Sequence, residues 1–257
     1  MLFDTHMHTR FSTDSQMHID EAVAAANKMD IGITLTEHLD LAFPQPNAFL
    51  FDTEEYFHRY GRYRNDKVLL GIELGMRADC LNDNRRIVAS HPFDYVIGSI
   101  HVVDNIDIYT EDFYLHRTKQ EVYQQYFDSM IQCLKTYTFI HSLGHIDYIA
   151  RYARYQDTEI YYPDFSDRID QVLQLLVDHQ KALEINTRRL GRQETVQALI
   201  PIYRRFFELG GRFITIGSDA HNPKDIGRGM DAALDIAERC GLRAVWFQNG
   251  QLRYIKR

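Results

Sequence analysis

The sequence predicts an α/β protein whose parallel strands close into one (β/α) barrel. Short apolar runs of β type alternate with segments whose apolar residues recur at helical spacing, and this alternation indicates a parallel sheet. About seven such units follow one another without an internal repeat and without a linker rich in proline, glycine or serine. A chain of 257 residues has the size of such a barrel, so we expect a single domain over residues 1–257.

The expected elements follow in chain order. The predicted strands cover residues 2–3, 31–38, 68–73, 95–101, 137–145, 182–186, 212–221 and 244–248. Helical spacing of apolar residues predicts helices over residues 19–29, 53–64, 118–137, 164–180, 195–210 and 225–240. Pro44 and Pro46 predict a loop over 41–49, and an Asn-Gly pair within 247–254 predicts a hairpin.

The composition excludes several classes of protein. With 45% hydrophobic and 25% charged residues, the chain resembles an ordinary globular protein. The formal net charge of −7 argues against a coat for long nucleic acid or for an anionic membrane, although a local basic pocket can still bind one phosphate. Cys80, Cys133 and Cys240 form no Cys-x-x-Cys pair, so neither a disulfide framework nor a thiolate zinc site is predicted. No signal-peptide pattern and no membrane-length apolar run is present, and we expect a cytoplasmic protein.

Potential metal ligands recur where the predicted strands end. Side chains two residues apart in an extended segment project from the same face, so His6 and His8 point at one spot. Half of the twelve histidines fall at strand ends, which converge on one mouth in a (β/α) barrel. The strand-end motifs are Asp4-x-His6-x-His8, Thr36-Glu37-His38, Ile72-Glu73, Ser99-Ile100-His101, Gly144-His145, Glu184-x-Asn186 and Ser218-Asp219-Ala220-His221.

These ligand types favour a metal-dependent hydrolase. Imidazole and carboxylate together suit Zn²⁺, Mn²⁺ or Fe, and the candidates exceed the four ligands of one tetrahedral structural zinc. More than one metal is therefore expected. Neighbouring metal ions can share a bridging carboxylate and a hydroxide, and they can bind both oxygens in an in-line phosphoryl transfer.

Seven short motifs, in order from residue 4 to residue 221, resemble those of the polymerase and histidinol phosphatase (PHP) superfamily: DTHMHT, TEH, GIELG, GSIH, GHIDYI, EINT and GSDAH. The resemblance implies a distorted seven-stranded (β/α) TIM-like barrel and a cluster of three divalent transition metal ions at the C-terminal strand ends. Within the family, a chain of this length with GHIDYIARY and EINTRR is most similar to the monofunctional histidinol-phosphate phosphatases.

The resemblance also implies the ligand sets. One metal would take His6, His8, Glu73 and Asp219, a second Glu73, His101 and His145, and a third Asp14, His38 and His221. Glu73 would bridge two of the ions, and we expect Glu73, Asp219 and His221 to be catalytic. Asp14 departs from the commonest pattern, because several relatives have histidine at that position. Its alternative role is that of a turn aspartate that caps its own loop.

The remaining histidines match no ligand motif and are expected to lie at the surface or to make ordinary hydrogen bonds: His18, His58, His91, His116, His141 and His179. His141 is the strongest candidate for a missed ligand, because it lies four residues before His145.

Three arginines follow strand-end motifs and are expected to bind the phosphate of a substrate: Arg151, Arg188 and Arg189. The guanidinium group suits phosphate oxygens, but each arginine can instead pair with nearby carboxylates on a solvated face. The tyrosines within 152–162 can stack on a substrate imidazole or pack between helices.

The predicted function is hydrolysis of L-histidinol phosphate to L-histidinol and phosphate by a metal-bound hydroxide, a reaction of histidine biosynthesis. The expected partner is a small-molecule phosphate monoester, and the sequence does not indicate an oligomeric state. Two alternatives remain open. One is a PHP phosphoesterase that acts on a nucleotide, an oligonucleotide end or phosphotyrosine, and the other is a non-catalytic domain stabilised by its metals.

Overall fold

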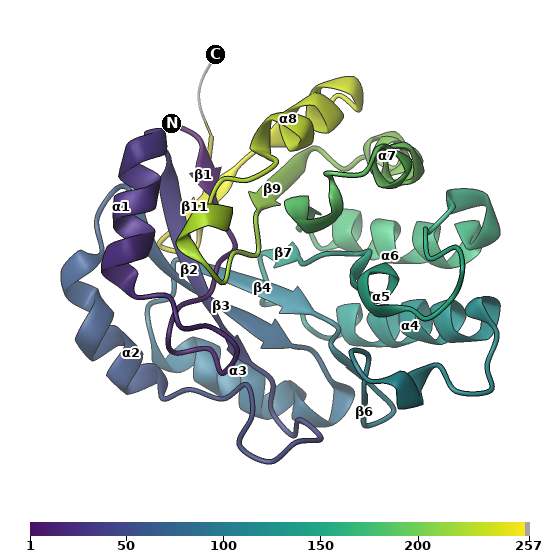
Figure 1. Ribbon diagram of the computed structural model, residues 1–257, viewed down its shortest axis with the longest axis horizontal. Coiled ribbons are helices and arrows are strands. Elements are labelled where there is room, and N and C mark those ends of the chain that lie inside the picture. Colours follow the sequence, from purple (N-terminus) through teal and green to yellow (C-terminus); the bar gives the residue numbers. More distant parts are fainter. Residues whose placement is uncertain (255–257) are drawn as a thin grey trace.

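A computed structural model describes residues 1–254 and confirms an α/β fold around a curled parallel sheet (Figure 1). The strands follow one another in the order β1 (Phe3–Asp4), β2 (Gly32–Leu39), β3 (Val68–Gly75), β4 (Tyr95–Ser99), β7 (Ser142–Leu143), β8 (Ala182–Asn186), β9 (Phe213–Gly217) and β10 (Arg243–Ala244). The expected count of seven strands is wrong, because the sheet has eight, of which β10 is only two residues long.

The sheet curls far enough for its first strand to approach β9. The Thr5 amide donates to the Ile216 carbonyl at 2.8 Å, and the His8 amide donates to the Ala220 carbonyl at 2.9 Å. These bonds fix the segment after β1 beside the segment after β9. Two parts of the chain more than 200 residues apart therefore meet at the carboxyl end of the sheet.

In the described part of the chain, residues 1–254, eight α-helices pack around the sheet: α1 (Ile19–Met29), α2 (Thr53–Tyr60), α3 (Leu81–Ser90), α4 (Lys119–Leu134), α5 (Tyr148–Tyr152), α6 (Ser166–Asp178), α7 (Gln193–Glu208) and α8 (Met230–Arg239). Short 3₁₀ helices cover Gly61–Tyr63, Ala78–Cys80, Glu111–Phe113, Tyr162–Asp164, Thr187–Arg189 and Pro223–Asp225. Within residues 1–254, none of the helices has the length and apolar character needed to cross a membrane.

Two helices were not expected from the sequence. Helix α3 has no apolar period, because its buried residue is Asn84, which donates to the Gly75 carbonyl at 3.2 Å and to the Tyr137 hydroxyl at 3.0 Å. Helix α5 has only five residues. The helix expected over 225–240 begins at Met230, because Gly229 before it adopts a left-handed φ of 76°.

The C-terminal part of the chain confirms one expectation and corrects another. The strand expected over 244–248 is divided: β10 joins the main sheet, whereas β11 (Trp246–Gln248) pairs with β12 (Gln251–Arg253). Asn249 and Gly250 have φ angles of 53° and 69°, which is the geometry of a two-residue hairpin turn. The expected hairpin is therefore present. A second hairpin, β5 (Val102–Val103) with β6 (Ile106–Asp107), follows β4.

The loop expected over 41–49 contains neither helix nor strand. The strand expected over 137–145 is reduced to β7, although the His141 amide still donates to the Val96 carbonyl of β4 at 2.8 Å. All residues of β2 and β3 are buried, as expected for parallel strands covered on both faces. Polar residues in these two strands therefore need partners inside the protein.

Candidate metal centre

The nine expected ligands lie together at the carboxyl end of the sheet. They come from β2, β3 and the segments that follow β1, β4, β7 and β9: His6, His8, Asp14, His38, Glu73, His101, His145, Asp219 and His221. In the ladder between β2 and β3, His38 lies opposite Glu73. Parallel strands end at a common edge, which explains why residues from distant parts of the sequence meet there.

Glu73 lies at the centre of the group. Its Oε1 atom is 2.8 Å from His145 Nε2 and 3.4 Å from His101 Nε2. Its Oε2 atom is 2.9 Å from His38 Nδ1 and 3.2 Å from His6 Nε2. His8 Nε2 lies 3.5 Å from the same Oε2 atom, so one fully buried carboxylate faces five imidazoles from four segments of the chain.

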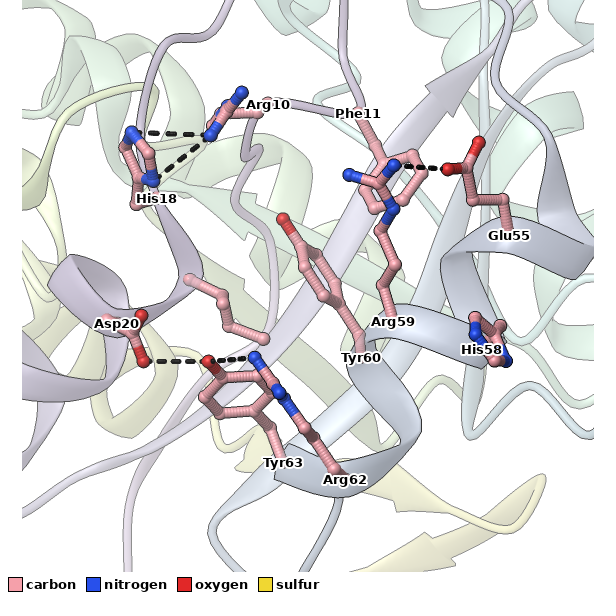
Figure 2. Close-up of a pocket in the computed structure, with 11 residues that line it drawn as sticks. Arg10, Phe11, His18, Asp20, Glu55, His58, Arg59, Tyr60, Arg62 and Tyr63 are labelled. Atoms are coloured by element: carbon pink, nitrogen blue, oxygen red, sulfur yellow. Dashed lines mark hydrogen bonds and ion pairs between the residues drawn. The ribbon is translucent and has the colours of Figure 1, made fainter.

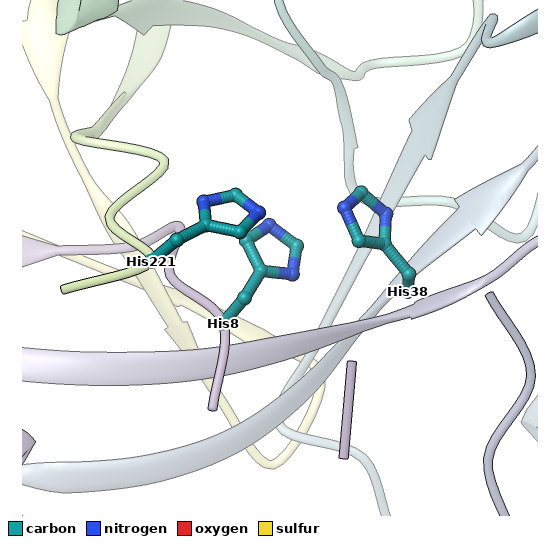
Figure 3. A group of neighbouring side chains, drawn as sticks. All are labelled: His8, His38 and His221. Carbon is teal, nitrogen blue, oxygen red and sulfur yellow. The ribbon is translucent and has the colours of Figure 1, made fainter. Parts of the chain in front are cut away.

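A second group surrounds His8, which comes from the segment after β1. His8 Nε2 lies 3.1 Å from His6 Nε2 and 3.4 Å from Asp219 Oδ1. The His8 ring stacks on both His38 and His221, with centroids 4.0 and 4.4 Å apart (Figure 3). Asp219 has a left-handed φ of 54°, a conformation that costs a non-glycine residue free energy and that often marks functional sites.

Asp14 lies at the outer side of the group. Its Oδ2 atom is 3.0 Å from His221 Nε2 and 3.8 Å from His38 Nε2, and its side chain is 41% exposed. The side chain therefore faces the two histidines with which the resemblance groups it.

The donor set fits divalent transition metal ions. Four triplets of donor atoms lie within 4.8 Å of one another: His8, His38 and His221; His6, Glu73 and His145; His6, His8 and Asp219; and His38, Asp40 and His101. Within residues 1–254, several of these buried atoms make no hydrogen bond, among them Glu73 Oε2, His38 Nδ1 and Asp40 Oδ2. Buried polar atoms normally have partners, so unpaired atoms at the focus of a ligand cluster are those that a cation would satisfy.

The cluster holds both charged and neutral groups. Burial opposes the charge of His6, His38 and His101, but nearby carboxylates raise their pKa, so a metal ion would have to displace protons from these imidazoles. Burial opposes ionisation of Glu73, but His6, His38 and His101 outweigh it and hold the pKa of the carboxyl well below its usual value. Burial, together with charge on His38 and His221, holds the pKa of His8 well below its usual value. An ionised carboxylate and a neutral imidazole are the forms that bind metals.

Three further side chains orient these histidines. Glu184 Oε1 lies 2.7 Å from His6 Nδ1, Asp40 Oδ1 lies 2.8 Å from His101 Nδ1, and Ser12 Oγ lies 3.1 Å from His8 Nδ1. Each contact leaves the Nε2 atom of the ring directed at the cluster. Partners on the second ring nitrogen are typical of metal-binding histidines. Glu184 was expected only as part of a strand-end motif, and Asp40 and Ser12 were not expected at the site. Asp40 follows His38 at the two-residue spacing that places both on one strand face.

A cavity of about 350 Å³ opens over the cluster. Aromatic side chains line much of its wall: Phe43, Phe49, Tyr109, Tyr148 and Tyr152. The two phenylalanines come from the proline-containing loop, to which the sequence analysis gave no function. Asp107 and Arg151 also line the cavity and supply opposite charges.

The three expected arginines line one groove beside the cavity, and Arg151 also lines the cavity itself. Arg151 lines the cavity and donates to Asp219 Oδ2 at 2.7 Å and to Asn186 Oδ1 at 3.2 Å. Arg188 lies in that neighbouring groove of about 730 Å³ and donates to the Asp219 carbonyl at 2.8 Å.

Arg189 also lines the neighbouring groove, but its guanidinium is bound to two carboxylates. It donates to Asp147 Oδ2 and Glu159 Oε1, each at 2.7 Å, and its side chain is 9% exposed. Arg189 therefore pairs with carboxylates, which was the alternative to phosphate binding in the sequence-based expectation.

The other histidines lie away from the cluster. His141 Nδ1 accepts a hydrogen bond from the Val96 amide at 2.9 Å, at the opposite end of the sheet. His18 and His58 line a separate cavity of about 450 Å³ beside α1 and α2 (Figure 2). There Arg10 contacts His18, and none of the nine clustered side chains takes part.

Known proteins match most of this chain in sequence. A family model described as the PHP domain matches residues 4–188. The chain is 49% identical over 254 residues to a protein of Clostridium acetobutylicum named probable histidinol-phosphatase, which covers 99% of this chain and 100% of that protein. It is 32% identical over 248 residues to the histidinol-phosphatase of Lactococcus lactis, which covers 93% of this chain and 91% of the relative.

A solved structure is similar over nearly the whole chain. It is the crystal structure of histidinol phosphate phosphatase from Lactococcus lactis, complexed with zinc, L-histidinol and phosphate. The TM-score is 0.93 at 30% sequence identity, and the match covers 98% of each chain. The family match, the full-length relatives and the fold together show that the chain belongs to the PHP domain family.

Proposed function

We propose that this chain is a metal-dependent phosphatase that hydrolyses L-histidinol phosphate to L-histidinol and inorganic phosphate in histidine biosynthesis. The observation that carries the proposal is the likeness over 98% of the chain to a phosphatase whose structure holds zinc, L-histidinol and phosphate. The full set of nine clustered side chains argues against a non-catalytic domain, because a domain that has lost activity has no need to keep all of them. We further propose one catalytic domain over residues 1–257, active in the cytoplasm, where a soluble substrate is available.

We assign the nine side chains to three divalent ions of zinc, manganese or iron. Glu73 would be shared between an ion held by His6, His8 and Asp219 and an ion held by His101 and His145. Asp14, His38 and His221 would hold the third ion. When bound, such ions lower the pKa of a water molecule and neutralise charge on phosphoryl oxygens.

The remaining residues bind and orient. Arg151 lies beside Asp219 at the cavity wall, and we assign it to the non-bridging oxygens of the phosphoryl group. Glu184, Asp40 and Ser12 keep three imidazoles in a single orientation. The aromatic wall excludes water around the ester and provides apolar surface for a leaving alcohol that carries an imidazole.

The test is a comparison of kcat/KM among phosphate monoesters. Purified, metal-loaded protein is assayed with L-histidinol phosphate, a nucleoside monophosphate, phosphotyrosine and a short oligonucleotide with a 5′-phosphate. We expect L-histidinol phosphate to be the best substrate. If another ester is preferred by about tenfold or more, the broader PHP phosphoesterase function replaces this proposal. The Glu73→Gln variant, prepared in the same way, controls for a contaminating phosphatase.

A further inference from the structure

One acidic side chain of the cavity wall takes no part in the cluster. Four aspartates line the cavity, and three of them, Asp14, Asp40 and Asp219, lie within 4 Å of clustered histidines. The fourth is Asp107, which is half-buried at the end of the β5–β6 hairpin. Its Oδ1 atom accepts a hydrogen bond from the Tyr109 amide at 2.8 Å.

The backbone places Asp107 next to the metal centre. The Ile108 amide donates to the His101 carbonyl at 3.0 Å, so the hairpin folds back along the segment that carries a proposed ligand. Within residues 1–254, no lysine, arginine or histidine side chain forms an ion pair with Asp107. Burial raises the pKa of this carboxyl, and a cationic ligand would relieve the cost of its charge.

Tyrosines extend from the cluster toward the outer end of the cavity. The Tyr148 ring lies 4.9 Å from that of His101 and 5.1 Å from that of Tyr152, which in turn lies 5.0 Å from Tyr109. Tyr109 is 58% exposed. Aromatic faces attract organic cations, and the Arg151 guanidinium already lies over the Tyr148 and Tyr152 rings, at 5.4 and 5.8 Å. Tyr109 and Asp107 are the groups of this wall that favour a cationic ligand.

The cavity wall therefore combines groups of different chemistry. The histidine cluster and Arg151 suit the phosphoryl group, whereas Asp107 is a carboxylate without a cationic partner in the described chain. We propose that Asp107 binds the ammonium group of the leaving alcohol, so that the enzyme selects phosphate monoesters whose alcohol carries a primary amine. This inference rests on the proposed phosphatase function and adds the residue that binds the amine of the substrate.

The test compares two esters that differ only in the amine. L-histidinol phosphate carries it, and 3-(imidazol-4-yl)propyl phosphate lacks it. We expect the wild-type protein to prefer the aminated ester in kcat/KM by about tenfold or more, the range of a charge-assisted hydrogen bond. In Asp107→Asn the preference should fall to about one. In the matched control Asp112→Asn, which removes an exposed carboxylate five residues further along the same segment, the preference should stay at the wild-type value.

Product inhibition provides a second measurement. Asp107→Asn should raise the inhibition constant of L-histidinol by about tenfold and leave that of inorganic phosphate unchanged. If Asp107→Asn keeps the wild-type substrate preference, or raises the inhibition constants of L-histidinol and phosphate equally, Asp107 does not bind the amine. The proposed phosphatase function would then still hold. If the wild-type protein hydrolyses other esters and not L-histidinol phosphate, the proposed function fails and the inference fails with it.

Discussion

The two ends of the sheet both bury a carboxylate, but only one of the two is satisfied by the chain. At the amino end, Asp94 accepts two hydrogen bonds from Arg64, at 2.9 and 2.7 Å, and one each from the amides of Leu70 and Asn249. At the carboxyl end, Glu73 faces five imidazoles, and its Oε2 atom makes no hydrogen bond within residues 1–254. A buried charge that the chain satisfies by itself is structural, whereas one that it leaves open marks a place for a cation.

Histidines show the same contrast. His141, at the amino end, accepts from the Val96 amide through Nδ1, and its ring stacks on Phe247 with centroids 4.8 Å apart. His38, at the carboxyl end, has its Nδ1 atom 2.9 Å from Glu73 Oε2 without hydrogen-bond geometry. The residue type is therefore less informative than whether each ring nitrogen has a partner.

The largest effect is expected when Glu73, the carboxylate at the centre of the cluster, is removed. We expect Glu73→Ala to lower kcat/KM by roughly 10³-fold or more, because the carboxylate contacts five imidazoles and is proposed to bridge two ions. Circular dichroism should show the wild-type fold, and the isosteric Glu73→Gln controls for the lost volume. Turnover at the wild-type rate would place Glu73 outside the centre.

Arg151 and Arg188, both at the carboxyl end of the sheet, test which arginine binds the phosphoryl group. Arg151→Ala should weaken kcat/KM by roughly 1.5–3 kcal/mol, the scale of a charged hydrogen bond, and Arg151→Lys should restore only part of the loss. Arg188→Ala should have a smaller effect, because that side chain lies in the neighbouring groove. Equal losses in the two alanine variants would contradict a specific role for Arg151.

Glu184 tests whether orientation of the ligands matters. It accepts from the His145 amide at 2.7 Å and contacts His6 Nδ1, so a glutamine must turn its amide NH₂ toward one of these two donors. We expect Glu184→Gln to lower metal affinity by about tenfold, measured by competition with a chromophoric chelator. Wild-type affinity in this variant would show that His6 needs no fixed tautomer.

The smallest expected effect is at the amino end. Burial, with some contribution from Lys181, lowers the pKa of His141 to about 4. Between this pKa and that of the unfolded chain, the imidazole is protonated in the unfolded state and neutral in the folded state. The stability that depends on neutral His141 is complete above about pH 6.5 and is lost as the pH falls toward 4. Lowering the pH from 7 to 5.5 should therefore reduce the free energy of unfolding by roughly 1 kcal/mol through His141.

The matched variant is His141→Asn, whose amide oxygen can accept from the same Val96 amide. Urea denaturation at both pH values should show a smaller loss of stability in the variant than in the wild-type protein. Identical losses would mean that His141 does not titrate in this range.

The fold class was predictable because alternation of strands and helices depends on local apolar periodicity. The errors arose where tertiary contacts override that periodicity. Helix α3 is held by the polar Asn84, β7 is two residues long, and β10 separates from β11 because the Asn249-Gly250 turn directs the last strands into their own hairpin. The single strand expected over 244–248 is therefore divided between two sheets.

The candidate site was predictable in part, because its ligands fall at the ends of separate strands. Residues that orient the ligands or line the cavity carry no comparable signal. Asp107 lies in a hairpin after β4, and Phe49 lies in an irregular loop. Their positions over the cluster follow from the curl of the sheet and from loop packing, neither of which has a sequence period.

The central claim is that the carboxyl end of the sheet holds several metal ions. Its most direct test is the ratio of transition metal to protein, measured by elemental analysis after purification without chelators and again after reconstitution with zinc, manganese or iron. The account predicts more than one ion per chain, rising toward about three on reconstitution, and a clear loss in Glu73→Ala. A wild-type ratio that stays near zero under both conditions would contradict it.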